Sequence, residues 1–261
     1  EKMAWPTDLT RLLKRISTPA EEVFRGLRVL GDYNKTSMDA GHDAMEARLL
    51  IEWAGKFATN RFYVSVEGGN DAYDGLTLAK PFATIGEAVD RCKAGDHAYD
   101  PNKLDYIFIA PGLYPEGDII QEGHGTHLIG LGIPGMDSGV RVIPNADPEY
   151  GVLLLQAAHC EVANIHFQSA YADPILWSPN HLDNSHIHHC TFAGNWDTTP
   201  DCIKLLNTRN SIIEHNLITG FKEKAINCYM GAEAWLIDTI IRKNRIGISW
   251  EGLTKNAKGI Y

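Results

Sequence analysis

The sequence predicts a mainly β protein, a parallel solenoid of about seven coils preceded by a small α-helical region. Apolar residues in the second half return at intervals of 20 to 28 residues, which is the length of one coil. The charge balance also changes along the chain. Residues 1–60 carry nine acidic and nine basic side chains, whereas residues 61–261 carry 24 acidic and 15 basic ones. We therefore expect a helical region at residues 1–60 and a solenoid domain at residues 61–261.

Three stretches before residue 60 have the apolar spacing of short amphipathic helices. They span residues 9–16, 19–30 and 38–56, and the second follows the capping-box sequence Thr18-Pro19-Ala20-Glu21. Such helices either pack as a cap on the next domain or serve as an attachment and oligomerisation module. Both interpretations stay open on the sequence alone.

The composition excludes several classes of protein. A 261-residue chain with 44% hydrophobic residues can bury a sizeable core, which excludes a wholly disordered protein. Without an apolar run of 18 residues we expect no membrane insertion. A net charge of −9 argues against nucleic acid as a partner, because a phosphate backbone needs a basic face. Five widely spaced cysteines indicate buried thiols rather than a disulfide framework, and so favour assembly in a reducing compartment.

The solenoid domain opens with a strand, a turn, a helix and a second strand. The first strand is expected at residues 62–66, an amphipathic helix at 80–92 and a strand ending in a Pro-Gly turn at 105–114. The Asn-, Asp- and Gly-rich segment 67–75 lies between the first strand and the helix. It lacks the ligand spacing of an EF-hand calcium loop, so a plain turn is the better interpretation.

This opening resembles that of a known superfamily. The run YVSVEGGNDAYDGLTLAKPFATIGEAVDRCKAGD, followed by YIFIAPGLYPEG, is similar to the start of right-handed parallel β-helix proteins of the pectin-lyase-like superfamily. The resemblance covers roughly residues 62–261. Bacteriophage tailspike and tail-fibre proteins share this opening with bacterial polysaccharide-active proteins. The resemblance implies the fold more specifically than the reaction.

Two apolar columns define the expected coils. The first runs through Phe167, Phe192, Ile218 and Ile241, together with Val162, Ile187, Ile213 and Leu236. The second runs through Ile175, Ile203, Ile226 and Ile246. A third inward column holds Ile165, Cys190, Asn216 and Thr239, where the family often has an asparagine ladder of which only Asn216 is expected here.

The same alignment gathers polar residues on an outer face. It places His188, His189, Glu214 and His215 together, with Asp238 one coil beyond Glu214. A carboxylate beside imidazoles can transfer protons near neutral pH, so we expect His188, Glu214 and His215 to be catalytic if the protein is an enzyme. A stacked polar ladder without chemistry is the alternative.

Two other chemistries are less favoured at this patch. A zinc site within residues 186–190 is disfavoured because Cys190 is expected to point inward while His189 points outward. The resemblance implies that a lyase of this superfamily would use a basic residue, often beside calcium-binding aspartates. Lyase chemistry is disfavoured because the alignment shows no aspartate cluster with an Arg or Lys in the matching column. We expect no metal and no cofactor.

Aromatic and acidic residues in the expected loops suggest sugar binding. Trp177 and Trp196 lie near Asp183 and Asp197, and aromatic rings stack on sugar CH faces while carboxylates accept from hydroxyls. We expect these four residues and His189 to bind carbohydrate. The alternative is that the indole rings cover the edge of the core.

These observations together predict a virion-associated protein similar to phage tailspikes and tail fibres. It would bind host-surface polysaccharide, with or without hydrolysis, and contact other virion proteins through residues 1–60. A homotrimer is implied by analogy only. The alternatives are an exported, hence secreted, bacterial polysaccharide lyase or hydrolase, and a structural capsid or baseplate appendage. Residues 257–261 resemble the start of another coil, so we expect the solenoid to continue or to be covered by a partner.

Overall fold

The structure is a computed structural model that describes residues 60–93, 104–132, 139–228, 236–247 and 258–260. The chain divides into two compact units, Glu1–Ala58 and Thr59–Tyr261. The three helices expected before residue 60 lie outside the described residues. Within the described part, none of the helices is both long and apolar enough to cross a membrane.

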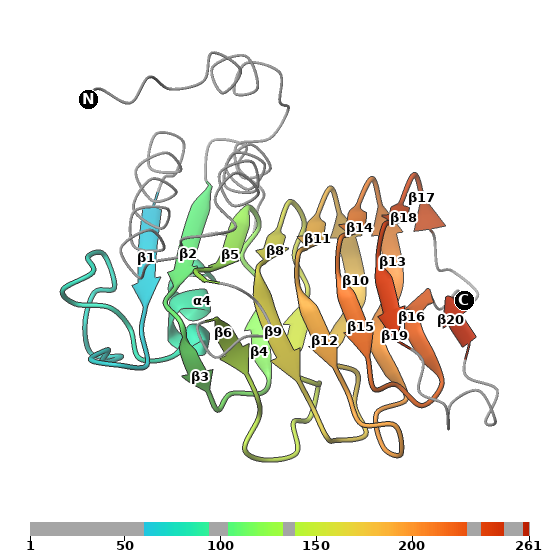
Figure 1. The fold of residues 1–261 in the computed structure, drawn as a ribbon. Coiled ribbons are helices and arrows are strands. Elements are labelled where there is room, and N and C mark those ends of the chain that lie inside the picture. Colours follow the sequence, from blue (N-terminus) through green and yellow to red (C-terminus); the bar gives the residue numbers. More distant parts are fainter. Residues whose placement is uncertain (1–59, 94–103, 133–138, 229–235, 248–257, 261) are drawn as a thin grey trace, which may run out of the picture. The chain divides into compact units, whose positions relative to one another are not determined.

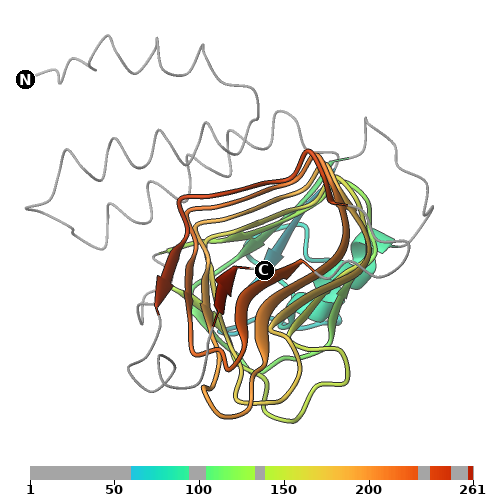
Figure 2. The ribbon, with the colours of Figure 1, turned by 90° about the vertical axis from the view of Figure 1, so that its right-hand side faces the viewer.

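Three parallel sheets make up the second unit, and the chain visits them in turn (Figure 1). Viewed along the stack, successive coils lie over one another (Figure 2). Sheet 1 contains β1 (Asn60–Val64), β2 (Asp105–Ile109), β5 (Thr126–Gly130), β8 (Glu161–Ala163), β11 (His186–His188), β14 (Ile212–Glu214) and β18 (Ile240–Arg242). Its seven strands agree with the expected number of coils.

The other two sheets complete each coil. Sheet 2 contains β3 (Gly112–Tyr114), β6 (Val140–Val142), β9 (Ile165–Gln168), β12 (Thr191–Ala193), β15 (Leu217–Thr219) and β19 (Arg245–Gly247). Sheet 3 contains β4 (Ile119–Gln121), β7 (Leu153–Leu155), β10 (Leu176–Asp183), β13 (Asp201–Arg209), β16 (Lys224–Cys228) and β20 (Lys258–Ile260). The short strand β17 (Leu236–Ile237) pairs with the end of β13.

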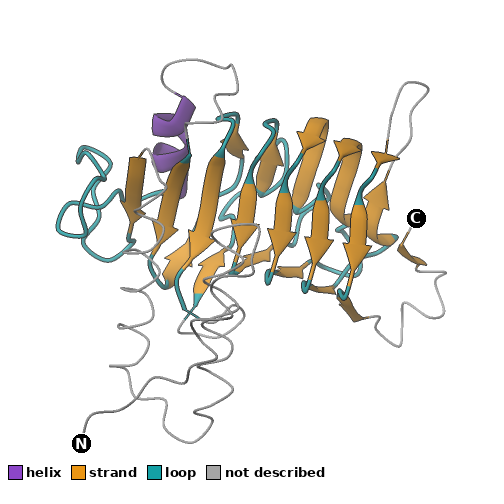
Figure 3. Ribbon diagram, turned by 90° about the horizontal axis from the view of Figure 1, so that it is seen from above, coloured by secondary structure: helices purple, strands orange, loops and turns teal. Residues whose placement is uncertain are grey.

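Helix α4 (Ile85–Lys93) lies between β1 and β2 in the chain and packs beside the first coils (Figure 3). Thr84 Oγ1 accepts the Glu87 N–H at 3.2 Å, a helix-capping contact. The Glu116 carboxylate accepts the N–H groups of Ile85 and Gly86, both at 2.9 Å. These contacts satisfy backbone donors that have no partner inside the helix.

The segment expected to be a plain turn is held by its own side chains. Asn70 Oδ1 accepts the Ala72 N–H, and Asp74 Oδ1 accepts the Leu76 N–H. Asp71 accepts the N–H groups of two residues that lead into α4. The Asx turns thus use these side-chain oxygens to fix the backbone, as expected of turn-forming residues.

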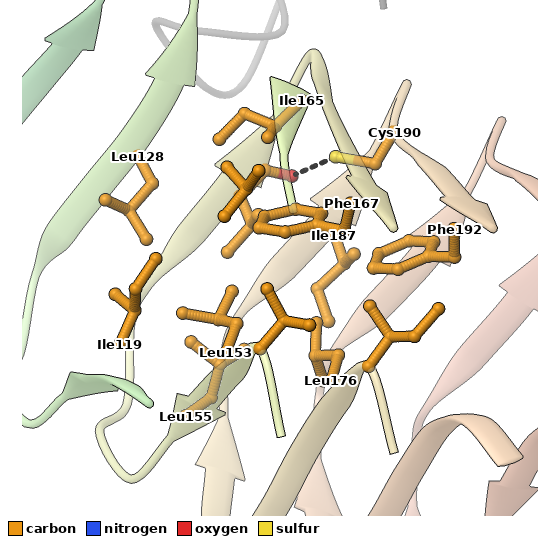
Figure 4. Packing of buried hydrophobic residues seen from close by; sticks show 14 of the residues in the cluster. Ile119, Leu128, Leu153, Leu155, Ile165, Phe167, Leu176, Ile187, Cys190 and Phe192 are labelled. Atoms are coloured by element: carbon orange, nitrogen blue, oxygen red, sulfur yellow. Dashed lines mark hydrogen bonds between the residues drawn. The ribbon is translucent and has the colours of Figure 1, made fainter. Parts of the chain in front are cut away.

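The core runs through the middle of the coils (Figure 4). Most of the expected inward residues are confirmed, because they are at most 2% exposed: Val162, Ile165, Phe167, Ile187, Cys190, Phe192, Asn216, Ile213 and Ile218. The rings of Phe167 and Phe192 stack across neighbouring coils with centroids 5.5 Å apart. Aligned aromatic and β-branched side chains on successive parallel strands therefore hold the coils in register.

The register expected for the last coil is wrong. Ile213 pairs with Ile241 rather than Leu236, and Ile218 pairs with Ile246 rather than Ile241. The second column needs two corrections as well. Ile203 and Ile226 do pair, but their neighbours in the column are Leu176 and Ile260 instead of Ile175 and Ile246.

Residues with positive φ lie at both ends of four strands of sheet 1, β8, β11, β14 and β18. His159, Asn184, Asn210 and Asp238 precede the strands, with φ between 48° and 59°. Asn164, His189, His215 and Lys243 follow them, with φ between 54° and 60°. Asn and Asp tolerate this left-handed conformation better than most residues, which explains their frequency at the corners.

Candidate functional site

Four polar side chains gather on the outer face of sheet 1, across three neighbouring coils. They are Glu161 from β8, His186 and His188 from β11, and Glu214 from β14. Each adjoins an inward apolar residue of a three-residue strand, so alternation points it away from the core. The parallel register sets His186 beside Glu161 and His188 beside Glu214. We call these four residues the histidine–glutamate cluster.

Glu161 is bound by an imidazole at each carboxylate oxygen. Its Oε1 lies 2.8 Å from His188 Nε2, and its Oε2 lies 2.7 Å from His127 Nδ1. Burial favours a raised pKa, but the hydrogen bonds from His127 and His188 outweigh it and hold the pKa of Glu161 well below its usual range. The His127 ring in turn stacks on Tyr106 with centroids 4.4 Å apart. Glu161 is therefore a buried, charged and firmly oriented carboxylate.

Glu214 is held by a guanidinium on one side and faces an imidazole on the other. Its Oε2 lies 2.7 Å from Arg242 Nε, and its Oε1 lies 3.4 Å from His186 Nε2. Burial again acts to raise the pKa, and Arg242 reverses this effect, so the pKa of Glu214 is lowered. The partner expected one coil beyond Glu214 was Asp238. That expectation is wrong, because Arg242 occupies the paired position.

Two further histidines extend the cluster to the corner between sheets 1 and 2. His188 Nδ1 lies 2.7 Å from His189 Nδ1, so one of these two nitrogens must carry the shared proton. The rings of His189 and His215 stack across coils with centroids 5.1 Å apart. A continuous set of polar contacts therefore runs from His127 through Glu161 and His188 to His189.

This geometry limits the chemistry of the cluster. Glycoside hydrolysis by two carboxyl groups needs one of them protonated at the working pH, and such acids have raised pKa values. Both glutamates in the cluster have lowered pKa values instead. The cluster supplies charged oxygens and imidazole nitrogens, a set suited to binding a cation or passing a proton between histidines.

A second group of side chains lies on the outer face of sheet 3. Trp177 is in strand β10, between the buried residues Leu176 and Ser178, and is itself partly exposed. Its ring stacks loosely with Tyr150, with centroids 6.3 Å apart, and Lys204 Nζ lies 5.7 Å from the ring centroid. We call Tyr150, Trp177 and Lys204 the aromatic platform.

Carboxylates surround the aromatic platform. Burial raises the pKa of Asp173, the nearby charges of Asp147 and Asp118 raise it further, and Lys204 opposes them. Asp118 also accepts the Tyr150 N–H at 2.7 Å, which ties the loop of one coil to the coil before it. The aromatic platform thus combines flat rings with a cationic donor, and carboxylate acceptors lie beside it.

Comparison with known proteins agrees with the geometry of the coils. A family profile described as "Right handed beta helix region" matches residues 138–258. The fold is a right-handed parallel β-helix. The sequence prediction of this fold is therefore confirmed, whereas the link to phage tailspikes has no support from the comparisons.

Three solved structures of pectin methylesterases align with the β-helix. They are pectin methylesterase PemA from Erwinia chrysanthemi (11% identity, TM-score 0.44), an enzyme in complex with hexasaccharide VII (12%, 0.42) and a variant in complex with hexasaccharide IV (10%, 0.43). The alignments cover 71–72% of this chain and 66–67% of the others. A comparison with curated proteins finds no match.

The β-helix brings the expected catalytic residues together. His188 and Glu214 are paired in register, and His215 Nε2 lies 3.7 Å from Glu214 Oε2. His188 is buried, at 1% exposure, although its strand position points it outward. The catalytic roles of these three residues stay predictions.

The expected sugar-binding residues, by contrast, lie in different parts of the coil. Trp177 and Asp183 are both in β10, six residues apart, a separation of about 20 Å along a strand. Trp196 packs against Phe221 with centroids 5.9 Å apart, and Asp197 is exposed in the same loop. His189 lies at the corner between sheets 1 and 2. Only Trp177 belongs to the aromatic platform.

Sequence reasoning missed the glutamate and the arginine that complete the histidine–glutamate cluster and its surroundings. Glu161 lies 25 residues before His186, which is one coil length, and that spacing was a usable signal. Arg242 was hidden by the register error in the last coil.

Proposed function

We propose that this protein binds a host-surface polysaccharide through the aromatic platform, as part of a virion-associated tailspike or tail fibre. The observation that carries the proposal is the pairing of Tyr150 with Trp177 on an outer sheet face. Aromatic rings of this kind stack on the CH faces of sugars, while charged side chains beside them bind hydroxyl groups.

The position of the aromatic platform suits a chain-like ligand. Five positions on sheet 3 follow one another in register, one from each coil: Ile120, Leu154, Trp177, Lys204 and Asn227. Leu154 and Asn227 are buried, whereas Ile120, Trp177 and Lys204 are partly exposed. Trp177 and Lys204 are paired on successive coils, and neighbouring strands are about 4.8 Å apart, so an extended glycan lying along the β-helix meets the Trp177 ring on one coil and Lys204 on the next. A linear oligosaccharide is therefore a better fit than a single sugar.

Charge narrows the class of glycan. The net charge of −9 resides in residues 61–261, and Asp118, Asp147 and Asp173 lie close to the platform. An acidic surface repels a densely anionic polymer such as pectate. We therefore propose a neutral or sparsely charged polysaccharide, with Lys204 binding hydroxyl groups or an isolated acidic substituent.

The virion setting is supported by the opening of the solenoid domain and by the charge-balanced region before it. In this setting residues 1–60 bind other virion proteins, and three copies of the chain form a homotrimer. Sedimentation analysis of the full chain should give three protomers. A monomer that is secreted by bacteria and absent from purified particles would instead favour the exported lyase or hydrolase.

Retention on a broad glycan array tests the binding function. The full chain should bind a defined set of oligosaccharides, and Trp177→Ala should lower the affinity at least about tenfold, a loss of 1.4 kcal/mol. Tyr73→Ala is a matched control, because Tyr73 is an exposed aromatic residue in the turn before α4. Retention of no glycan would overturn the proposal and favour a structural appendage.

Incubation with the retained glycans tests catalysis separately. Release of reducing ends would indicate hydrolysis, and release of unsaturated ends would indicate a lyase. Loss of release in His188→Ala and Glu214→Ala, with binding preserved, would assign catalysis to the predicted residues. Binding without release would leave the protein as an adhesin.

A further inference from the structure

We propose that Glu161, His186 and His188 form a binding site for a divalent transition-metal ion, with zinc the best fit. One ligand atom from each residue lies within 4.8 Å of the other two. Two imidazoles and one carboxylate are a ligand set that zinc takes in proteins, with an open fourth position. The site lies on sheet 1, whereas the aromatic platform lies on sheet 3, so this inference does not depend on the proposed glycan binding.

The strand geometry makes the three ligands converge. His186 and His188 are two residues apart on β11, so both point to the outer face, and their ring centroids are 3.9 Å apart. Glu161 comes from the adjacent strand in register with His186, and its Oε1 lies 2.8 Å from His188 Nε2. Ligand atoms around a tetrahedral zinc ion are about 3.4 Å apart, given bonds of about 2.0–2.1 Å. Small side-chain rotations therefore suffice to admit an ion.

A fourth ligand is close by. Glu214 Oε1 lies 3.4 Å from His186 Nε2, while its other oxygen is bound by Arg242. Rotation about the Cγ–Cδ bond would bring Oε1 to the ion, and the Arg242 side chain, which is 47% exposed, would have to follow the movement of Oε2. Either this oxygen or a water molecule completes four-coordination. With Glu214 included, two carboxylates face the double positive charge of the ion together with the single charge of Arg242.

The surrounding contacts orient the ligands as zinc sites require. His127 Nδ1 binds Glu161 Oε2 at 2.7 Å, which fixes the carboxylate and leaves Oε1 directed toward His188. His188 Nδ1 contacts His189 Nδ1 at 2.7 Å. When His188 Nε2 binds the ion, the His188 proton is on Nδ1, and this N–H donates a hydrogen bond to His189 Nδ1. Such outer hydrogen bonds set the tautomer and ring orientation of metal-binding histidines.

The ligand chemistry separates this site from a calcium or magnesium site. Calcium and magnesium take oxygen ligands almost exclusively, whereas imidazole nitrogens favour zinc, copper, nickel and cobalt. The ligand set also differs from the one considered from the sequence. Cys190 is inward, with its Sγ 3.6 Å from the Val162 carbonyl oxygen, and takes no part. Glu161, one coil away, supplies the anionic ligand instead.

Calorimetric titration of the chelator-treated full chain with zinc chloride tests the site. The wild-type chain should bind one zinc ion per protomer, and cobalt added in its place should give the visible absorption of a four-coordinate ion. Glu161→Gln and His186→Ala should each weaken zinc binding by more than about 10- to 100-fold, the loss seen for outer-shell changes alone. His166→Ala is the matched control, since His166 is an imidazole on the outer face of sheet 2, and its affinity should not change.

The possible outcomes separate the metal site from a purely structural cluster. The proposal would be overturned if the folded wild-type protein bound no zinc. It would also be overturned if the Glu161→Gln variant bound zinc with the same affinity as the wild type. If Glu161→Gln does not fold, as judged by circular dichroism, the wild-type cobalt spectrum decides. If the wild-type sample then showed only the octahedral spectrum of hydrated cobalt, the proposal would be overturned. A zinc-dependent rise in melting temperature that is absent from His186→Ala would support it.

Discussion

Cys190 and Asn216 occupy equivalent corners of successive coils, and the backbone N–H of Cys190 donates to Asn216 Oδ1 at 2.9 Å. The Asn216 amide group donates to the Ile187 carbonyl at 3.0 Å and to Asn244 Oδ1 at 3.1 Å. Asn244 repeats the pattern by donating to the Ile213 carbonyl at 2.9 Å. The asparagine ladder thus has two members, where the sequence indicated one. Side-chain amides here satisfy buried backbone groups at a corner of the coil.

Replacing Asn216 should therefore destabilise the β-helix. Asn216→Ala leaves the Cys190 N–H and the Ile187 carbonyl without their side-chain partner, at a cost of about 1–3 kcal/mol. Thermal unfolding followed by circular dichroism measures the change. Asn195→Ala is the control, because the Asn195 side chain accepts the Asp197 N–H in an outer loop, and it should cost less. Equal losses in the two variants would contradict a special role for the ladder.

The missed Asn244 shows where sequence reasoning reached its limit. Residues in the left-handed conformation occur at both corners of sheet 1, and the two are five residues apart, as with Asn210 and His215 or Asp238 and Lys243. The third residue after each of these corners is apolar, namely Ile213, Ile218, Ile241 and Ile246, so a shift of five residues still places apolar residues inward. The expected last coil has this error, with Leu236 in the place of Ile241. Only inter-coil hydrogen bonding separates the two registers.

The parts of the fold set by burial were predictable. Coil length, the inward columns and the neighbouring positions of His188 and Glu214 all follow from apolar periodicity. Glu161 and Arg242 were not predicted, because identifying them needs the register of coils that the pattern leaves ambiguous. The gathering of Tyr150 with Trp177 depends on a long loop between sheets, whose path no periodicity describes.

At the corner between sheets 2 and 3, replacing Gly220 by alanine should strongly destabilise the β-helix. Gly220 has φ +71°, and a Cβ atom there would lie 2.0 Å from the Gly194 carbonyl oxygen. Because both the conformation and the backbone contact oppose a side chain, Gly220→Ala should cost more than the roughly 1 kcal/mol of left-handed strain alone. The shift in melting temperature measures it.

The Gly68→Ala variant measures the cost of the left-handed backbone conformation without a steric contact. Gly68 has φ +81° with no atom within 4 Å of a Cβ position, so its substitution carries the conformational cost only. Gly220→Ala should therefore lower the melting temperature more than Gly68→Ala does. A smaller effect at Gly220 would mean that the two coils separate easily at this corner.

The corrected register makes a prediction about Glu214. Arg242→Gln removes its 2.7 Å ion pair, whereas Asp238→Asn should leave Glu214 unaffected. The Arg242 side chain is 47% exposed, so solvent screening limits the loss of stability to about 0–1 kcal/mol. Raising the salt concentration should reduce the difference between wild type and Arg242→Gln. A salt-sensitive loss in Asp238→Asn, with none in Arg242→Gln, would restore the original alignment.

Three buried thiols should make stability fall at alkaline pH. Burial raises the pKa of Cys160 from its usual 9.0 to about 11, and raises those of Cys190 and Cys202 to about 12. The unfolded chain therefore loses these protons near pH 9 while the folded chain keeps them. Proton loss favours the unfolded chain, so this stability is complete below pH 9 and is lost as the pH rises toward 11 to 12. Each thiol adds up to about 1.4 kcal/mol of loss per pH unit within that range.

Urea unfolding between pH 8 and 10.5 measures this effect as a difference in slope. Tyr106 and Tyr114 also have raised pKa values from burial and titrate in the alkaline range, so the slope of the wild type alone does not isolate the thiols. A variant with Cys160→Ala, Cys190→Ala and Cys202→Ala should be less stable at pH 8 because core atoms are lost. It should nevertheless lose stability more slowly as the pH rises. Parallel curves for the variant and the wild type would contradict the prediction, because they would mean that the thiols ionise equally in the folded and unfolded chains. Burial of all three thiols is the reason to expect unequal ionisation.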